Sequence, residues 1–423
     1  MKHKYGINVL YIITKLELGG AQKVCLSLIK GLENEGHNPL LITGKEGYFV
    51  DQLKNAPNIL FIDTFKREIS PKYIFNEFIN FLKIIKRIRN IKKVNDHLIV
   101  HTHSTKAGII GRWAAFFCGV KTRIHTVHGF AFHQNQSLYK WFIIYIIELL
   151  TSFITTHYIC VSSEDAKTGL KLFPRFSKKH SIIRAAVDSE KFIGAYFPTT
   201  HEVTPDKRYT VSVEALAKSD QYERPLKSFI SSDSERIVSR DDCTNQSTVF
   251  IFGTVACFKE QKNLFDLLKA FHKVSLENPN TSLEIIGDGI LRPQIESFIK
   301  EHKLDSKITL HGWQLEVAPI MKNWNAFVLT SLWEGLPCSV IEARMLKIPV
   351  LSYKTGGIPD IISDQQNGLL FEQKDWPCLA NGMLEISKNS DFQDKLANFQ
   401  DNLSDFDNLK MVLDHIKLYK EIG

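Results

Sequence analysis

The sequence predicts an α/β protein with two doubly wound parallel sheets, one in each half of the chain. Short apolar runs typical of strands alternate with amphipathic helical patterns through both halves, as expected for parallel sheets covered by helices. A polar stretch at 197–247 separates the two halves. The length of 423 residues is ample for two domains.

We expect four segments along the chain. Residues 1–196 form a first Rossmann-like domain and residues 248–400 form a second one. Residues 197–247 are rich in Ser, Thr, Asp, Glu and Lys and have weak periodicity, which predicts a partly disordered insertion or a mobile flap. Residues 401–423 contain a last helix at 409–422.

The composition favours a cytosolic protein with anionic partners. Hydrophobic residues make up 44% of the chain and charged residues 23%, which is ordinary for a globular protein. The net charge of +7 suits nucleotide phosphates, lipid diphosphates or an anionic membrane surface, and the sequence has no motif for nucleic-acid recognition. The seven cysteines include no Cys-x-x-Cys pair, which predicts reduced thiols and no structural zinc.

The apolar segments predict no membrane span. Ile7–Ile13 is short, contains Asn8 and precedes no small-residue cleavage site, so it predicts a first strand and not a signal peptide. The longest apolar stretch, Trp141–Ile154, is interrupted by Glu148 and is too short to cross a bilayer.

The first strand leads into a glycine turn and a helix. The turn contains Gly19 and Gly20, and the helix at Gln22–Leu32 is expected to end near Gly31. These glycines let the backbone approach an anionic ligand, although a simple tight turn explains them about as well. The remaining elements expected in this half are strands at 38–43, 98–100, 123–127, 158–161 and 181–183 and helices at 73–93 and 138–155.

Two helices of the first half have apolar surfaces that either pack in the core or contact a membrane. The helix at 73–93 has an apolar stripe opposite a basic side, so it either faces the core or lies against anionic lipid headgroups. The stripe consists of Phe75, Phe78, Leu82, Ile85 and Ile88, and the basic side of Lys83, Lys86, Arg87, Arg89, Lys92 and Lys93. The helix at 138–155 is apolar nearly all round; a membrane interface is the alternative, and we expect burial.

The second half is organised around a strand, a turn and a helix between Phe327 and Leu346. The turn contains Gly335 and Pro337, and such a loop at the carboxyl end of a strand is where α/β proteins bind ligands. Glu334 and Glu342, eight positions apart, frame the turn, but this pair alone is explained better by a solvated helix start. The other elements expected are strands at 249–255, 282–286, 308–310 and 349–352 and helices at 264–276 and 292–302.

A series of motifs in the second half resembles one family of enzymes. In order they are Gly-Thr-Val-Ala, Gln-Lys-Asn, Gly-Asp-Gly, Gly-Trp, Ser-Leu-Trp-Glu-Gly-Leu-Pro and Thr-Gly-Gly-Ile-Pro-Asp. Together with the spacing of Glu334 and Glu342, this series resembles the retaining, family-4-type glycosyltransferases of the GT-B fold. The resemblance covers about Tyr5–Phe192 and Val249–Ile422 and is most specific in Gly253–Asp360.

The resemblance implies a function and a setting. The active site would lie in a cleft between an acceptor-side first domain and a second domain that binds a nucleotide sugar, with the last helix packed back on the first domain. The donor would be a UDP-sugar, without a cofactor, and the acceptor a lipid-diphosphate-linked saccharide of bacterial surface polysaccharide assembly. The enzyme would be cytoplasmic and peripheral at the inner face of the membrane.

The resemblance also assigns roles to residues. The diphosphate gains negative charge as it leaves and the sugar becomes oxocarbenium-like, so the site must supply cations and N–H groups. Catalytic roles fall to Glu334 on the sugar hydroxyls, His128 on the sugar and Lys262 on the diphosphate. Donor binding falls to Gly20 at the diphosphate, Gly335 and Leu336 through their backbones, Glu342 at the ribose, and Gly287 and Trp313 near the base.

The loop expected at 101–108 follows a strand of the first domain. His103, Ser104 and Lys106 in it are therefore candidate acceptor contacts.

Cys257 departs from the family pattern. The family usually has an Arg at this position, and that Arg binds phosphate. Its loss implies weakened donor binding, compensation by Lys259 or Arg292, or a non-catalytic member. We expect an active enzyme because Lys262, Glu334 and Glu342 are all present.

The sequence predicts no metal site. The histidines at 101 and 103 have no third ligand nearby at a metal-binding spacing. The only Asp-x-Asp triplet, Asp405-Phe406-Asp407, lies in a polar turn that predicts a helix start.

Three other functions are compatible with parts of the pattern. A GT-B-fold sugar-nucleotide epimerase shares the two-domain architecture, and Cys257 and the insertion fit a non-catalytic partner of another glycosyltransferase. A Rossmann dehydrogenase is a weaker alternative, because no Gly-x-Gly-x-x-Gly follows the first strand.

Overall fold

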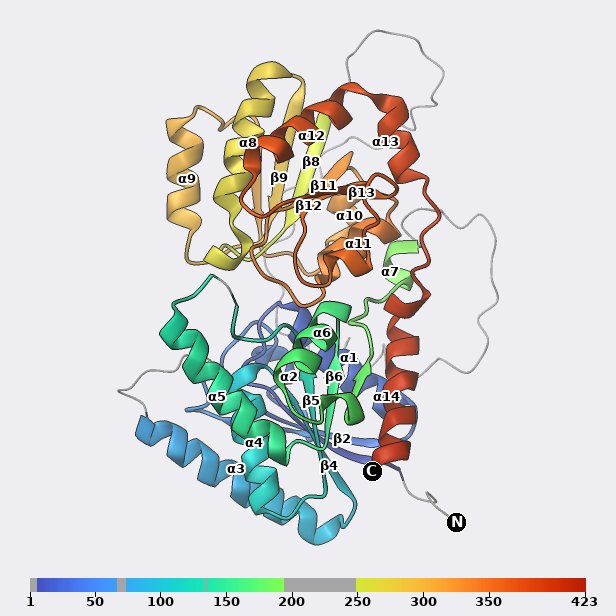
Figure 1. The fold of residues 1–423 in the computed structure, drawn as a ribbon. Coiled ribbons are helices and arrows are strands. Elements are labelled where there is room, and N and C mark those ends of the chain that lie inside the picture. The colour runs from blue at the N-terminus through green and yellow to red at the C-terminus, as the bar shows by residue number, and fades with distance from the viewer. Residues whose placement is uncertain (1–5, 67–73, 134, 194–248) are drawn as a thin grey trace, which may run out of the picture. The chain divides into compact units, whose positions relative to one another are not determined.

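The computed structural model describes residues 6–66, 74–133, 135–193 and 249–423 (Figure 1). The insertion expected at 197–247 lies outside these residues. The predicted fold class is confirmed, since the described residues form two parallel sheets with α-helices or, between β12 and β13, a 3-10 turn between successive strands.

The first sheet has seven strands in the order β3-β2-β1-β4-β5-β6-β7, and every pairing is parallel. One of these strands, β3, was not predicted from the sequence. The bounds are β1 Asn8–Ile12, β2 Asn38–Gly44, β3 Ile59–Ile62, β4 Leu98–His103, β5 Thr122–Val127, β6 His157–Cys160 and β7 His180–Ile182.

The second sheet has six strands in the order β10-β9-β8-β11-β12-β13, again all parallel among the described residues. The last of these strands, β13, was not predicted from the sequence. The bounds are β8 Phe250–Val255, β9 Thr281–Ile286, β10 Ile308–Gly312, β11 Ala326–Leu329, β12 Val350–Tyr353 and β13 Gly368–Phe371.

Helices connect the strands of both sheets. In the first half they are α1 Gly20–Asn34, α2 Val50–Leu53, α3 Ile74–Val94, α4 Thr105–Phe117, α5 Leu138–Ile154, α6 Ser163–Leu172 and α7 Glu190–Ile193. In the second half they are α8 Leu264–Glu277, α9 Arg292–Glu301, α10 Ala318–Met321, α11 Cys338–Met345, α12 Trp376–Lys388, α13 Ser390–Ala397 and α14 Asn408–Ile422. Short 3-10 turns lie at η2 Phe176–Lys178, η3 Glu260–Lys262, η4 Ile358–Asp360 and η5 Ser404–Phe406.

The order of the strands fixes where a ligand can bind. The chain direction across each sheet reverses between β1 and β4 in the first and between β8 and β11 in the second. At such a switch point the loops after two neighbouring strands diverge and leave a crevice at the carboxyl ends. β4 and β11 are buried along their whole length, so these central strands hold their loops in fixed positions.

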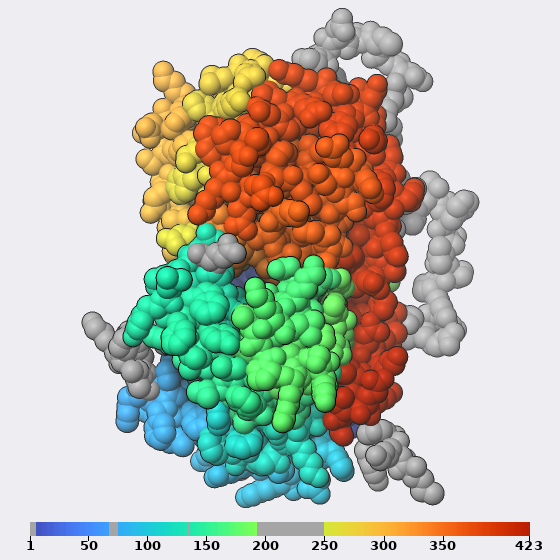
Figure 2. All heavy atoms as spheres, viewed as in Figure 1, coloured from blue at the N-terminus to red at the C-terminus, as the bar shows by residue number. Residues whose placement is uncertain are grey.

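Helix α14 joins the end of the chain to the first sheet and α1. The Tyr419 hydroxyl lies 2.9 Å from the Tyr11 hydroxyl of β1, and Thr122 donates to the carbonyl of Ile422 (3.1 Å). In the space-filling view the red atoms of α14 lie beside the green atoms of the first half (Figure 2).

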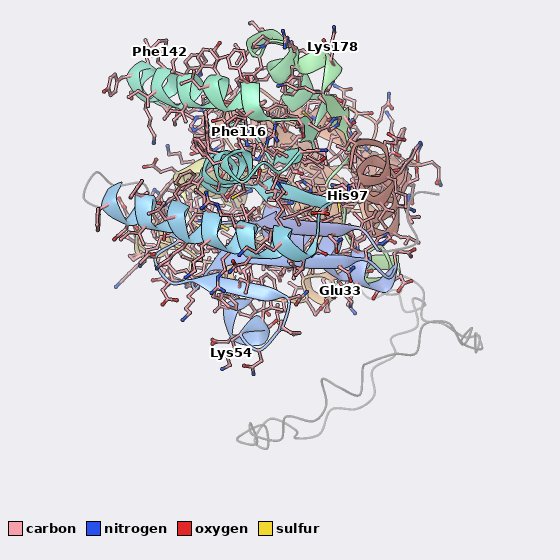
Figure 3. The ribbon with its side chains drawn as sticks, turned by 90° about the horizontal axis from the view of Figure 1, so that it is seen from below. Glu33, Lys54, His97, Phe116, Phe142 and Lys178 are labelled. Carbon is pink, nitrogen blue, oxygen red and sulfur yellow. The ribbon has the colours of Figure 1, made fainter. Side chains whose placement is uncertain are left out.

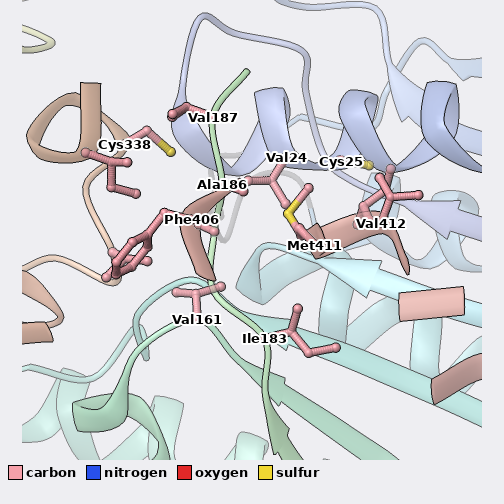
Figure 4. Packing of buried hydrophobic residues seen from close by; sticks show 14 of the residues in the cluster. Val24, Cys25, Val161, Ile183, Ala186, Val187, Cys338, Phe406, Met411 and Val412 are labelled. Carbon is pink, nitrogen blue, oxygen red and sulfur yellow. The ribbon is translucent and has the colours of Figure 1, made fainter. Parts of the chain in front are cut away.

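The packing of α14 corrects one boundary. Gly31 does not end α1, which continues to Asn34. A Cβ atom on Gly31 would lie 2.4 Å from a methyl carbon of Val412, so this glycine gives α14 room to approach α1. Met411 and Val412 belong to the same core cluster as Val24 and Cys25 of α1 (Figure 4).

Another correction concerns the loop expected at 101–108. The strand β4 continues to His103, and α4 begins at Thr105, so only Ser104 lies between them. Ser104 adopts a φ of 63°, which is unusual for a residue other than glycine. His103 and Lys106 are both buried as a result.

The apolar stripe expected on α3 is only partly buried. Of its members only Ile88 is fully buried, whereas Phe75 and Phe78 are 73% and 57% exposed; the other buried isoleucine of the helix, Ile84, was not part of the predicted stripe. The N-terminal residues of the stripe therefore face solvent, because the helix packs against α4 and the sheet through Ile84 and Ile88.

The expected burial of α5 is wrong for its outer side. The fully buried positions of this helix are Glu148, Thr151, Ser152 and Ile154. Its exposed large apolar side chains are Leu138, Tyr139, Phe142, Ile143, Ile147, Leu150 and Phe153. Figure 3 shows α3, α4 and α5 as neighbouring helices, with Phe142 on α5 and Phe116 on α4 labelled. No described helix is both long enough and apolar enough to cross a membrane.

A buried ion pair explains why the polar residues of α5 face the protein interior. Glu148 receives two hydrogen bonds from Arg112 of α4, at 2.8 and 3.0 Å, and both side chains are almost fully buried. Arg112 also donates to Thr155 (2.9 Å) and to the Tyr158 hydroxyl (3.2 Å). These contacts fix α5 on α4 and leave the apolar residues of α5 outside.

We expect Glu148→Ala to lower the free energy of unfolding by about 3–5 kcal/mol, because Arg112 would remain buried without its partner. The measurement is urea unfolding followed by circular dichroism. Glu385→Ala, at an exposed position of α12, is the control and should change stability by less than about 0.5 kcal/mol. Equal effects of the two substitutions would contradict this account.

Candidate functional site

A cavity of about 1870 Å³ lies where loops from both sheets meet. It is lined by the loop after β1, the start of α4, the loop after β5, and the loops after β8, β11 and β12. These are the carboxyl ends of strands at and beside the two switch points, where the fold places ligands.

Lys262 and Glu334, which both line the cavity, form an ion pair with Nζ and Oε1 2.5 Å apart. Their side chains are only 16% and 8% exposed. Two loops hold this geometry, because the Thr330 hydroxyl donates to the carbonyls of Lys262 and Asn263, at 3.0 Å each. The backbone N–H of Leu332 also donates to the carbonyl of Gln261 (2.8 Å).

The loop after β5 meets the loop after β11 through backbone contact at Gly335. A Cβ atom on Gly335 would lie 2.5 Å from the carbonyl carbon of His128, and one on Gly129 would lie 3.2 Å from the Gly335 nitrogen. No larger residue fits at Gly335 without displacing the loop. This contact brings His128 next to Glu334 and Leu336 in the cavity wall.

Glu342 lies in α11, where it is 95% buried yet lines the cavity. Its one ion pair among the described residues is with Lys23 of α1, at 3.7 Å. Gly20 lies at the start of α1, close to Cys338 at the start of α11; a Cβ atom on it would be 3.3 Å from the Cys338 sulfur. Burial raises the pKa of this thiol to about 12, so Cys338 is neutral near pH 7.

Lys23 lines the cavity but was not predicted from the sequence. Its position in the sequence could have indicated it. Lys23 lies three residues after Gly20, in the first turn of a helix whose N-terminus was expected to bind an anion.

The surroundings of Cys257 bear on the missing arginine. Cys257 is half-buried and lines the cavity, as does Lys259. Lys259 lies 3.5 Å from Glu17, across the cavity in the loop after β1. Arg292 does not line the cavity and is paired with Asp288 (2.9 Å) and Glu296 (2.7 Å). Lys259 is thus better placed than Arg292 to reach a ligand.

The two residues expected near the base, Trp313 and Gly287, differ in their positions. Trp313 lines the cavity and is 44% exposed. Gly287 does not line it, although Asp288 and Gly289 do. Gly287 has a φ of 134° and a Cβ atom on it would be 2.0 Å from the carbonyl oxygen of Ala256, so its role is to let two loops pack.

The three candidate acceptor residues differ in their positions. Ser104 lines the cavity, and its hydroxyl lies 3.2 Å from that of Thr14. Lys106 also lines it, but its ammonium group is held by the carboxylate of Glu77 and donates to the carbonyl of Lys66 (2.6 Å). His103 does not line the cavity; its Nδ1 lies 3.0 Å from Nε2 of His128.

His128 is the outermost member of a histidine cluster beneath the cavity. The rings of His101 and His103 are 4.5 Å apart, and those of His101 and His415 of α14 are 5.8 Å apart. His101 contacts the hydroxyls of Tyr419 (2.6 Å) and Thr126 (2.7 Å). The cluster therefore extends from the cavity to the C-terminal helix.

Burial keeps the clustered histidines neutral. It lowers the pKa of His128 and of His415 to about 4 each, and in His128 the nearby His415 adds to the effect. Burial, with neighbouring histidines, also holds the pKa values of His101 and His103 well below the usual range. A neutral His128 can donate or accept a hydrogen bond but carries no positive charge for a phosphate.

Two further features of the wall were missed from sequence. The rings of His133 and Trp333 stack 3.9 Å apart, joining the loops after β5 and β11. Asp165 is buried in the first turn of α6; burial raises its pKa to about 7, and hydrogen bonds from Ser162 and the backbone of 129–130 oppose the rise. Both features steady the loop that carries His128.

No group of three or more metal-ligating side chains occurs among the described residues. In the predicted helix start at 405–407, Asp407 accepts hydrogen bonds from the backbone N–H groups of Leu409 (2.9 Å) and Lys410 (3.2 Å). Asp407 is therefore the N-cap of α14.

Two family models match the chain. The model described as "Glycosyltransferase Family 4" matches residues 18–191, and the model described as "Glycosyl transferases group 1" matches residues 236–402. The first match spans the loop after β1 through α7, and the second contains every cavity loop of the second sheet.

Two curated proteins that are similar to this chain over most of its length are named as glycosyltransferases. An Escherichia coli protein named UDP-Gal:alpha-D-GlcNAc-diphosphoundecaprenol alpha-1,3-galactosyltransferase is 29% identical over 390 residues, covering 90% of this chain and 87% of that protein. The capsular polysaccharide biosynthesis glycosyltransferase CapM of Staphylococcus aureus is 22% identical over 368 residues, covering 84% and 82%.

A solved structure shares the fold. Anabaena HepE, in complex with UDP and glucose, superimposes with a TM-score of 0.71 at 14% identity, covering 98% of this chain and 100% of that one.

Because its buried histidines are neutral, the fold should lose stability in acid. The unfolded chain binds protons at a histidine pKa of about 6.5, so the free energy of unfolding falls as the pH drops below that value. Each histidine contributes up to about 1.4 kcal/mol per pH unit. For His128 and His415 the loss continues down to their folded pKa of about 4. Asp165, with its raised pKa, acts in the opposite direction but is a single group.

The measurement is urea unfolding between pH 7 and pH 5 for the wild type, His415→Phe and His97→Phe. His415→Phe should reduce the pH dependence by about 1 kcal/mol per pH unit, since one buried imidazole is gone. His97 is exposed, and its substitution should leave the dependence unchanged. A wild-type stability that does not vary over this range would contradict the argument.

Proposed function

The chain belongs to the family 4 and group 1 glycosyltransferases of the GT-B fold, and we propose that it transfers a sugar from a UDP-sugar to a lipid-diphosphate-linked saccharide with retention of configuration. The donor would bind against the second domain and the acceptor against the first. The transferred group would be a hexose or an N-acetylhexosamine. The E. coli relative, whose name specifies UDP-Gal and a GlcNAc-diphosphoundecaprenol, supports both substrate classes.

The observation that carries the proposal is the Lys262–Glu334 pair, together with Glu342, in one cavity wall. A buried ammonium group suits the charge that develops on a leaving diphosphate. A carboxylate that is already paired can still accept hydrogen bonds from sugar hydroxyls on its second oxygen. Glu342 has no hydrogen-bond partner among the described side chains, so it is free to accept from ribose hydroxyls.

Retention would follow from attack on the same face from which the diphosphate leaves, with a phosphate oxygen taking the proton of the acceptor hydroxyl. The proposed roles of the remaining residues follow their positions. His128, neutral and beside Glu334, would donate a hydrogen bond to the sugar. The backbones of Gly335 and Leu336 and the start of α1 at Gly20 would contact the sugar and diphosphate.

We expect Glu334→Ala and Lys262→Ala each to lower the rate of transfer by about a hundredfold or more, since each removes a charged group from the reacting centre. Glu342→Ala should weaken UDP binding by about one to two decades. The assay combines UDP-galactose with a short-chain GlcNAc-diphosphate lipid, and the anomeric configuration of the product is read by NMR.

Controls separate this function from its alternatives. Unfolding temperatures report whether the variants remain folded. A UDP-sugar incubated alone should yield no epimer, and UDP at a hundred times its dissociation constant should stabilise the fold by about 2.7 kcal/mol. Wild-type turnover in both glutamate variants would refute the assigned site.

The reaction is proposed to need no metal ion, since the Asp-x-Asp segment caps a helix and lies outside the cavity. Transfer should therefore proceed at an unchanged rate in excess EDTA. Activity that is lost on chelation and returns with Mg²⁺ or Mn²⁺ would overturn this expectation.

We also propose that the protein acts at the cytoplasmic face of a membrane, to which it binds peripherally. The support is the exposed apolar side of α5 beside α4 and the basic side of α3. Apolar side chains can enter the headgroup region while neighbouring lysines attract anionic lipids.

Co-sedimentation with anionic vesicles should occur at low salt and weaken at high salt. The triple variant Lys83→Glu, Lys86→Glu, Arg87→Glu should bind about a hundredfold more weakly, because each basic residue near the surface contributes about 1 kcal/mol. A charge-matched control replaces three exposed lysines of the second domain, at 269, 300 and 303. If wild type and control stay in the supernatant at low salt, the membrane proposal fails.

A further inference from the structure

One wall of the cavity is aromatic and belongs to the loop after β5 and to α5, whereas Lys262 and Glu334 belong to the second half of the chain. It begins at Phe130 and Phe132, whose rings are 5.0 Å apart, directly after the His128–Gly129 contact with Gly335. It continues through Trp141 of α5, 5.6 Å from Phe132. Ile144 and Ile147, one and two turns further along α5, also line the cavity. The hydroxyls and phosphates of a sugar nucleotide gain no hydrogen bonds from these rings and alkyl side chains.

Three lysines line the same wall. Lys140 lies in the first turn of α5, and Lys167 and Lys171 lie one turn apart on α6, so lysines of both helices line one cavity. All three are exposed, and none forms an ion pair with a described residue. A single exposed carboxylate, Glu164, lines this wall beside them. Unpaired cations next to an apolar surface fit an amphiphile with a strongly anionic head.

The apolar surface does not stop at the cavity. Beyond Ile147, which is 40% exposed, the outer side of α5 carries Phe142 and Ile143, at 58% and 38% exposure. Figure 3 shows Phe142 near one end of α5. An acceptor has its parts in the order sugar, diphosphate, lipid. The cavity has a surface suited to each part: the Lys262–Glu334 centre for the sugar, the three lysines for the diphosphate and the apolar side of α5 for the lipid.

We propose that the wall formed by α5, α6 and the loop after β5 binds the lipid diphosphate of the acceptor. Lys140, Lys167 and Lys171 would pair with the diphosphate, and Trp141 and Ile144 would contact the first carbons of the lipid. The inference rests on the proposed function, because it names the part of the acceptor that this wall holds. It differs from the acceptor contacts expected at Ser104 and Lys106, of which Lys106 is already paired with Glu77.

The test uses a soluble prenyl diphosphate, farnesyl diphosphate, and calorimetry on the full chain without vesicles. Farnesyl diphosphate should bind more tightly than either farnesol or inorganic pyrophosphate, since each of these offers only half of the contacts. The triple variant Lys140→Ala, Lys167→Ala, Lys171→Ala should bind it about thirtyfold more weakly, at roughly threefold for each exposed charge.

Trp141→Ala should weaken farnesyl diphosphate by about tenfold and leave pyrophosphate unchanged, because it removes only apolar contact. Lys178→Ala is the matched control: this exposed lysine follows α6 but does not line the cavity, and its loss should have no effect. The inference is overturned if the triple variant binds farnesyl diphosphate as the wild type does, or if pyrophosphate alone binds equally well.

UDP binding, measured on every variant, separates this inference from the proposed function. The lysine and tryptophan variants should keep wild-type affinity for UDP, which also shows that they are folded. Displacement of farnesyl diphosphate by UDP would place the probe at the donor end and refute the inference. Failure of the wild type to bind UDP would count against the proposed function instead, and the prenyl diphosphate titrations would still decide the role of this wall.

Discussion

The Lys262–Glu334 ion pair depends on the packing of two loops that leave neighbouring parallel strands. The Thr330 hydroxyl, just after β11, donates to the carbonyls of Lys262 and Asn263. These hydrogen bonds fix the two loops relative to each other, and Nζ of Lys262 and Oε1 of Glu334 then lie 2.5 Å apart. Because β8 and β11 flank the switch point of their sheet, the loops after them diverge and leave a crevice at the carboxyl ends. The side chains of the pair are only 16% and 8% exposed, and both residues line the cavity.

A second constraint is the close approach of backbones from the two halves. Gly335 and Gly129 have no room for side chains between them, and the backbone N–H of Ser163 donates to Asp360 (2.7 Å), which also pairs with Arg184. Such contacts set His128 beside Glu334. Since His128 is also bonded to His103, any shift of this loop would disturb the histidine cluster that reaches α14.

The first half combines two kinds of surface on the same helices. The Arg112–Glu148 pair turns the polar residues of α5 inward, and its apolar residues are then left for the solvent and for the cavity. A buried ion pair is costly unless it is well bonded, and here it has at least four hydrogen bonds at the arginine. The same interaction thus shapes both the proposed membrane side and the proposed lipid wall.

The sequence by itself determined the fold class, most element positions and the motifs that supply Lys262, Glu334 and Glu342, because these depend on local periodicity and on short spacings. It misplaced the end of α1 at Gly31, since only the approach of Val412, 381 positions away, explains that glycine. The apolar composition of α5 also led to the prediction that this helix is buried. Composition shows how many apolar residues a helix has, but not whether other elements cover them. Tertiary structure alone decided that His103 lies beneath the cavity and that Lys23 faces Glu342. It likewise decided which lysines remain unpaired beside an aromatic wall, since those contacts join residues distant in the chain.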